Sequence, residues 1–207
     1  MKVTKIATQQ QSENRVNIFV DGKFLTGADK LYVLQHQLSV GDELTTKSVR
    51  QLVADNARHQ AYARALKLLA LRPQSEAEMT QKLSRRWDGP TVLRVIEQLR
   101  REDLINDKRF ATIWVEERSR LRSRSLTHLR SELAHKGVDR VIIDRTLSNP
   151  EIVASQFEIA RQLAVRHLSK TGSNPRKTQA YLARRGYPYA VASRATREAE
   201  AGLANPQ

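Results

Sequence analysis

The chain has 207 residues, of which 40% are hydrophobic and 28% are charged, and it contains no cysteine. This apolar content is sufficient to bury a core, and the absence of cysteine excludes disulfides, thiolate metal sites and catalysis by a thiol. Lysine and arginine number 36 against 22 aspartate and glutamate residues, which gives a net charge of +14.

The positive charge begins after the N-terminal quarter and is then spread evenly. Residues 1–56 carry 7 basic and 6 acidic side chains, residues 57–106 and 107–150 each carry 10 and 6, and residues 151–207 carry 9 and 4. This distribution favours an extended contact with a polyanion or an acidic protein surface over one local pocket. The alternative is a cytoplasmic protein that happens to be basic.

The sequence carries no signal for a membrane or for export. No apolar run approaches the roughly 18 residues that a membrane span needs. The first fifteen residues, MKVTKIATQQQSENR, lack the apolar segment of a signal peptide. We therefore expect a soluble protein of the cytoplasm that makes no contact with a membrane.

The N-terminal segment has the pattern of β-structure. The apolar runs VNIFV (16–20) and KFL (23–25) flank Asp21-Gly22, a strong signal for a type I′ hairpin. The alternating KVTKIA (2–7) predicts a third strand, which a lone hairpin needs for stability. A short helix is expected within ADKLYVLQHQL (28–38).

From about Thr45 onward the pattern is helical, and several helix ends are visible in the sequence. Ser75 and Glu78 form a capping box, in which each residue satisfies a free backbone N–H of the other. Pro90 fits the first turn of a new helix, where its missing N–H costs nothing. Asn106 is placed to cap the helix that follows it, and Gly137 to end another in the left-handed conformation.

These features recur with a period of about 50 residues. The residues that share equivalent places are the leucines Leu83, Leu133 and Leu182, the caps Ser75, Ser125 and Asn174, and the helix ends Trp87, Gly137 and Gly186. We predict a mostly α-helical chain with three tandem three-helix repeats in an elongated curved array, following a small N-terminal β-hairpin and short helix. The alternative is a chance agreement among short amphipathic helices.

The predicted domain boundaries follow from this period. They are an N-terminal hairpin and short helix over residues 1–44, a linking helix and the first repeat over 45–106, the second repeat over 107–150 and the third over 151–207. Each repeat is small for independent stability, so the units should stack and share cores.

Several of these segments resemble the repeat signatures of the RecX family, bacterial modulators of the recombinase RecA. The matching segments are ALKLLALRPQSEAEMTQKL (65–83), LINDKRFATIWVEERSR (104–120) and LRSELAHKGVDRVIID (129–144), with RVNIFVDGKF and VGDEL (40–44) similar to an N-terminal extension. The resemblance covers essentially the whole chain in the expected order. Departures occur at the local turns, where Asp103, Ser125 and Trp87 replace glycines and Asn106 replaces aspartate.

The resemblance implies a regulator without catalytic activity or cofactor. Proteins of this family bind the RecA–DNA filament, lie along its helical groove, and limit its growth, its ATPase activity or strand exchange in recombination, DNA repair and the SOS response. We therefore expect a monomer that binds RecA and its filament, most simply as an inhibitor, with single-stranded DNA as a second contact. The alternative is a helical-repeat protein that binds single- or double-stranded DNA directly.

No catalytic motif is evident in the sequence. There is no nucleophile elbow and no phosphate-binding loop. His128, Glu132 and His135 share one helix face and could hold a metal ion, but a polar outer face explains them equally well, because Leu129 and Leu133 occupy the inner stripe. We expect no metal site.

The strongest binding candidate is the arginine-rich segment ERSRLRSRSLTHLR (117–130). Helical geometry places its alternate arginines on two flanks of Leu121, so that a solvated face paired with Glu116 and Glu117 is one interpretation. The other is a site for a polyanionic filament where two helix ends converge, with matching cations in the other repeats. The candidate residues are Arg118, Arg120, Arg122, Arg124, Arg130 and Lys136, with Arg85, Arg86, Arg184 and Arg185.

The aromatic residues have the helical spacing of core positions. Phe110, Trp114, Tyr181 and Tyr187 alternate with leucine and isoleucine. We therefore expect them to pack in the core and not to stack on nucleic-acid bases.

Overall fold

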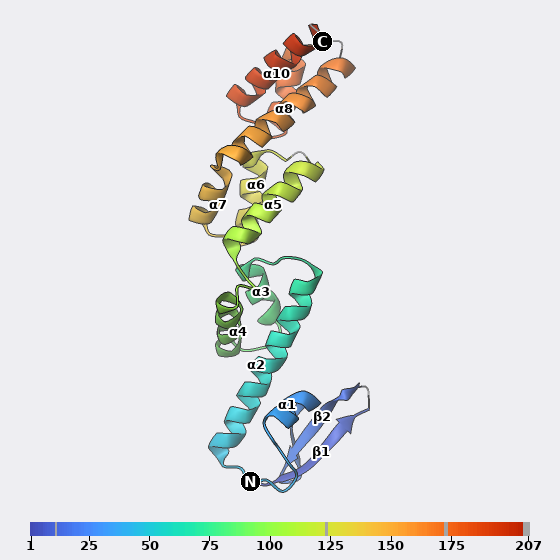
Figure 1. The fold of residues 1–207 in the computed structure, drawn as a ribbon, viewed down its shortest axis with the longest axis vertical. Coiled ribbons are helices and arrows are strands. Elements are labelled where there is room, and N and C mark those ends of the chain that lie inside the picture. Colours follow the sequence, from blue (N-terminus) through green and yellow to red (C-terminus); the bar gives the residue numbers. More distant parts are fainter. Residues whose placement is uncertain (11, 123, 172–173, 205–207) are drawn as a thin grey trace. The chain divides into compact units, whose positions relative to one another are not determined.

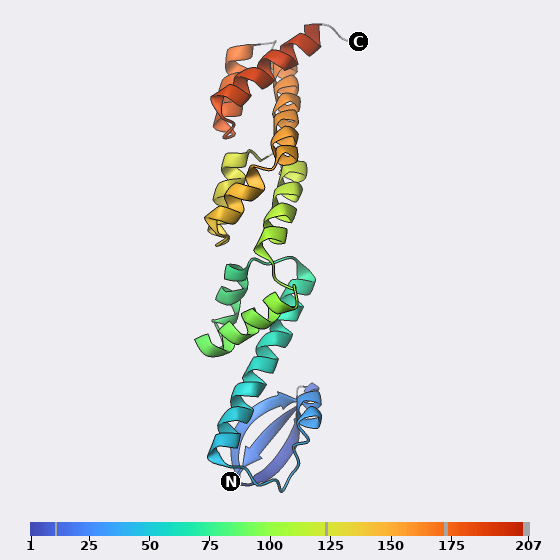
Figure 2. The same ribbon diagram turned by 60° about the vertical axis from the view of Figure 1, so that its left-hand side comes forward.

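The computed structural model describes residues 1–10, 12–122, 124–171 and 174–204, except for the side chains of residues 120–122 and 204. The described part contains three strands and ten helices (Figures 1 and 2). Their bounds are β1 Val3–Gln9, β2 Ser12–Val20, β3 Lys23–Asp29, α1 Lys30–Gln35, α2 Thr46–Leu71, α3 Glu76–Leu83, α4 Gly89–Arg101, α5 Asp107–Arg122, α6 Leu126–His135, α7 Arg140–Leu147, α8 Pro150–Lys170, α9 Pro175–Arg184 and α10 Tyr189–Ala204.

The chain divides into two compact units, which are described separately. The N-terminal unit comprises Met1–Gln74 and Met79–Leu104, and the C-terminal unit comprises Ser75–Glu78 and Ile105–Gln207. Across the described residues, no helix combines the length and the apolar character that crossing a membrane requires.

The N-terminal strands form one antiparallel sheet in the order β1-β2-β3. The predicted two-residue turn is confirmed: Asp21 and Gly22 have φ angles of 47° and 77°, both in the left-handed region that a type I′ turn requires. The third strand is also confirmed, and Val3 lies opposite Val20. One face of the sheet buries a small core that includes Ile18 and Tyr32.

Helix α2 is fixed to this sheet by polar contacts as well as by packing. The Asn56 side chain is buried and donates to the Thr26 hydroxyl (3.1 Å) and to the Gly27 carbonyl (2.9 Å). Gln60, one turn further along α2, donates to the same carbonyl at 2.6 Å. Because Gly27 lies in the edge strand β3, these bonds satisfy a carbonyl that has no further strand beside it. They also set which face of α2 lies beside the sheet.

The predicted helix ends are present. Ser75 Oγ accepts from the Glu78 N–H at 3.1 Å, and the Ser75 N–H donates back to the Glu78 carboxylate at 3.4 Å, which confirms the capping box. Asn106 Oδ1 accepts from two N–H groups of the first turn of α5, each at 3.1 Å. Gly137 has a φ of 73°, as a left-handed helix end requires.

The two departures from the expected glycines have different outcomes in the N-terminal unit. Asp103 takes over the left-handed conformation itself, with φ of 51°, and the turn after α4 still forms through the bond from Leu104 N–H to Leu99 O (2.9 Å). Trp87, by contrast, does not have a positive φ. Its N–H donates to Leu83 O at 3.1 Å, so the turn after α3 is of a different kind. The first repeat therefore ends its middle helix differently from the other two.

The three-helix repeats are confirmed, and they comprise α2–α4, α5–α7 and α8–α10. The equivalent leucines Leu83, Leu133 and Leu182 are all 0% exposed. The equivalent caps also agree: Ser125 accepts from the His128 N–H (3.4 Å), and Asn174 accepts from the Lys177 N–H (3.0 Å). A repeated burial position with a repeated cap is the sign of one structural unit used three times.

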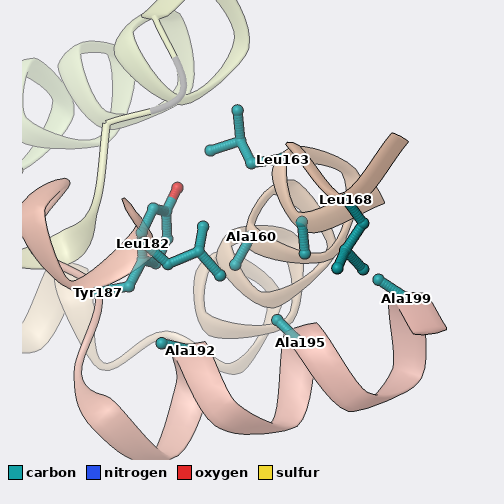
Figure 3. Packing of buried hydrophobic residues seen from close by; sticks show 9 residues of the cluster. Ala160, Leu163, Leu168, Leu182, Tyr187, Ala192, Ala195 and Ala199 are labelled. Atoms are coloured by element: carbon teal, nitrogen blue, oxygen red, sulfur yellow. The ribbon is translucent and has the colours of Figure 1, made fainter. Parts of the chain in front are cut away.

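The core of the third repeat shows how such a small unit packs (Figure 3). Helix α10 turns Ala192, Ala195 and Ala199 toward α8, and their small side chains allow the two helices to approach closely. Leu168 of α8 and Leu182 of α9 fill the space between the helices, and both are fully buried. The unit therefore has its own apolar core despite its size.

Candidate polyanion-binding surface

The arginine-rich segment is organised around one carboxylate, that of Glu132 on α6. Glu132 Oε2 accepts from the indole Nε1 of Trp114 at 2.9 Å. Arg118 Nε lies 3.7 Å from Oε2, and Arg124 Nε lies 3.4 Å from Oε1. The Arg118 guanidinium also lies over the Trp114 ring, 4.2 Å from its centre. Two candidate cations therefore share an internal counter-ion.

For Arg124, this arrangement differs from the pairing with Glu117 that the sequence suggested. The spacing of residues along one helix predicts contacts only within that helix, whereas Glu132 lies on α6. The backbone of Arg120 and Arg122 lies in the last turn of α5, but their side chains are outside the described part of the structure.

Arg130 and Lys136 are also engaged with acidic residues. Arg130 bonds to Asp144 of α7 and holds the pKa of that carboxyl below its ordinary value. Lys136 Nζ lies 2.8 Å from the Glu78 carboxylate, and both side chains are mostly buried. Its ammonium group also lies over the Trp114 ring, 4.2 Å from the centre. Lys136 therefore contributes to packing within the C-terminal unit, whereas Arg130 forms an exposed ion pair.

The cations at the equivalent places of the other repeats are more accessible. Arg184 and Arg185 are exposed at the end of α9, and Arg185 lies 5.0 Å from the centre of the Tyr181 ring. Arg85 and Arg86 are exposed in the turn after α3, and Arg86 lies 5.3 Å from the centre of the Trp87 ring. Among the candidates whose side chains are described, Arg118, Arg124, Arg130 and Lys136 of the second repeat have acidic partners, whereas the pairs in the first and third repeats are exposed.

Arg85 and Arg86 lie in a groove of about 620 Å³ within the N-terminal unit. Its walls are the sheet, α2 and the end of α3, and its lining includes cations that the sequence analysis did not single out: Arg15, Arg64, Lys67 and Lys82. No sequence signal marks them as a set, because they are separated by up to 67 positions along the chain. The spacing of Arg64 and Lys67 on one helix face was the one local hint.

The possible metal ligands on α6 are used in other ways. Glu132 is occupied by the contacts described above, and His128 Nδ1 lies 3.0 Å from Ser125 Oγ. Within the residues that the structure describes, no group of three histidine or acidic side chains is arranged to hold a metal ion.

The aromatic residues belong mainly to the cores, as expected. Phe110 and Tyr187 are each 4% exposed, and burial raises the pKa of Tyr187 to about 12. Trp114 and Tyr181 are partly buried and pack against the cores of the second and third repeats.

Three family models match the chain. Residues 1–45 match the regulatory protein RecX N-terminal domain, residues 61–99 match the first three-helix domain of RecX, and residues 106–147 match its second three-helix domain. The chain belongs to the RecX family. The helical repeats and the N-terminal sheet are therefore features that this chain shares with a family of regulatory proteins.

Individual RecX proteins resemble the chain over most of its length. The regulatory protein RecX of Clostridioides difficile is 28% identical over 197 residues, which cover 93% of this chain and 92% of that protein. That of Bacillus subtilis is 28% identical over 208 residues, which cover 96% of this chain and 77% of the relative.

Solved RecX structures share the fold. A crystal structure of regulatory protein RecX superimposes with a TM-score of 0.67 at 26% identity, covering 92% of this chain and 96% of the other. RecX from Lactobacillus salivarius superimposes with a TM-score of 0.64 at 22% identity, covering 70% of this chain and 98% of the other, and this likeness concerns the fold alone.

Proposed function

We propose that the chain is a non-enzymatic regulator that binds RecA and its nucleoprotein filament in the cytoplasm. Its effect would be to inhibit filament growth, ATPase activity and strand exchange. The observation that carries this proposal is the match of the N-terminal domain and two consecutive three-helix domains to RecX, in order and along the chain. Family relationship supplies the partner, and the physical properties of the chain are compatible with that partner.

The basic repeats provide a physical reason for filament binding. We propose the division into an N-terminal segment of residues 1–44 and repeats over 45–106, 107–150 and 151–207. Each of the last three segments has an excess of cations. A partner that presents phosphate or carboxylate groups at regular intervals can engage several repeats of one monomer, and each added contact reduces dissociation. The exposed pairs Arg85–Arg86 and Arg184–Arg185 are the strongest candidates for such contacts.

Binding to the filament can be measured by sedimentation. We expect the protein to co-sediment with RecA assembled on single-stranded DNA under conditions that block nucleotide hydrolysis. The matched tubes contain RecA without DNA and DNA without RecA, at the same protein concentration. Greater recovery in the pellet with RecA and DNA together than with either one alone supports a filament regulator. Equal recovery with DNA in the presence and absence of RecA would instead favour a DNA-binding protein.

A further inference from the structure

The groove in the N-terminal unit collects cations from three elements. Arg15 lies on β2, and Arg64 and Lys67 lie on α2. Lys82 lies at the end of α3, and Arg85 and Arg86 lie in the turn that follows. The bonds from Asn56 and Gln60 to Gly27 hold α2 beside the sheet. Arg64 and Lys67 follow on the next two turns of the same helix. The groove is thus a consequence of how α2 is anchored.

Most of these cations have no counter-ion in the described structure. The lining contains six cationic side chains and one carboxylate, that of Asp29, which faces Arg15 at 4.0 Å and His59 at 3.7 Å. Lys82 donates to the Gln74 side chain at 2.6 Å. Four exposed side chains remain that form no ion pair or hydrogen bond with any described residue: Arg64, Lys67, Arg85 and Arg86.

The groove differs from the second repeat in how its cations are paired. Arg118 and Arg124 face Glu132, and Lys136 faces Glu78. In the groove, by comparison, Arg64, Lys67, Arg85 and Arg86 converge without a carboxylate partner among the described residues. Their mutual repulsion is unfavourable in the free protein and would be relieved by an anion, so the groove should attract a polyanion more strongly than the paired cations Arg118, Arg124 and Lys136 do.

The lining favours a phosphate backbone over an acidic peptide. Peptide segments are usually anchored by apolar side chains that enter pockets. The apolar lining of this groove consists only of Ala63, the buried Leu68 and Trp87, and the Arg86 guanidinium lies over the Trp87 ring. The groove therefore offers little to an apolar anchor. Guanidinium groups bind phosphate in a bidentate manner, and an arginine stacked on an aromatic ring offers a flat surface for a base. A concave site encloses one strand, whereas a duplex presents its phosphates on a convex surface that would reach only the rim.

We propose that this groove, lined by Arg64, Lys67, Arg85 and Arg86, binds the phosphate backbone of single-stranded nucleic acid. The proposal deepens the filament-binding function by naming where a DNA strand would lie on this chain. It does not require RecA, so that it can be tested separately.

The test is the binding of a fluorescein-labelled oligothymidylate by the full-length protein, followed by anisotropy over a range of salt concentrations without RecA. For single strands, the slope of log K against log salt is about −0.7 for each phosphate neutralised. Replacing two groove cations in Arg64→Glu/Arg85→Glu should therefore make the slope less negative by about 1.4, and raise Kd by about tenfold or more at low salt. Arg64→Gln/Arg85→Gln should change the slope similarly with a smaller rise in Kd.

The matched control is Arg50→Glu/Arg94→Glu. Both arginines are exposed in the same unit, Arg50 also lies on α2, and neither lines the groove. The control makes the same change in net charge and should leave at least half of the wild-type affinity. Circular dichroism checks that all variants are folded. Equal losses in the control and groove variants, or a groove variant that binds as wild type, would overturn the proposal.

Two further measurements compare single-stranded DNA with an acidic polypeptide and with duplex DNA. Polyglutamate of the same charge should displace the oligonucleotide poorly; displacement at equal charge concentration would assign the groove to an acidic protein segment. A duplex of the same sequence length should bind more weakly than the single strand, and a preference for duplex would refute the single-strand assignment. Because RecA is absent, a failure here leaves the sedimentation result with RecA unaffected.

Discussion

Replacement of Leu133 by alanine is expected to lower the free energy of unfolding by about 2–5 kcal/mol. Leu133 lies on α6, is 0% exposed and packs among the buried residues of the second repeat, which include Phe110, Leu129 and Ile143. Truncation removes favourable burial and leaves a cavity that a close-packed core fills only in part. Urea unfolding followed by far-ultraviolet circular dichroism measures the change.

The control for this substitution is Leu93→Ala on α4. Leu93 is 57% exposed, so the same chemical change should alter stability by about 0.5 kcal/mol or less. Equal stability of Leu133→Ala and the wild-type protein would contradict the assignment of Leu133 as a core position and, with it, the register of the repeats.

The second large effect is expected for Gly137→Ala. Gly137 has a φ of 73°, where a residue with a Cβ atom is strained by about 1–2 kcal/mol. A Cβ atom at this position would also lie 2.3 Å from the Cβ of Ala77, so that the backbone must shift. We therefore expect a loss of stability larger than the strain alone, measured in the same unfolding experiment.

Gly89→Ala provides the matched comparison. Gly89 begins α4 and has open space where a Cβ atom would be placed, and its φ is not positive. Alanine should be neutral or slightly stabilising there, because glycine is the more flexible residue in the unfolded chain. If Gly137→Ala proved as stable as Gly89→Ala, the close approach between Gly137 and Ala77 would be disproved.

The sequence was sufficient to predict the features of the fold that depend on neighbouring residues. The capping box of Ser75 and Glu78, the Asp21-Gly22 turn and the left-handed Gly137 each follow from local backbone chemistry. The buried leucines could be aligned because the same local pattern occurs three times. Asp103 shows the limit of this reasoning, since it adopts the left-handed conformation without being glycine.

The sequence was sufficient to predict that the repeats are basic, but not which charged side chains lie together. Helical spacing suggested Glu117 of α5 as a partner for Arg124, whereas Arg124 lies beside Glu132 of α6, as Arg118 does. The groove unites residues from β2, α2 and the turn after α3, and their proximity depends on how α2 is anchored to the sheet. Such contacts between distant segments have no periodic signal in the sequence. The binding roles of all these cations remain predictions.

The ATPase activity of RecA on single-stranded DNA tests the proposed function most directly. RecA and DNA are held constant, and the rate of ATP hydrolysis is followed as the wild-type protein is added, with Arg50→Glu/Arg94→Glu as a variant that should act normally. We expect the rate to fall as this protein is added, at concentrations below that of RecA, because each bound molecule limits filament growth. An unchanged rate at protein concentrations equal to that of RecA would contradict the proposed inhibition.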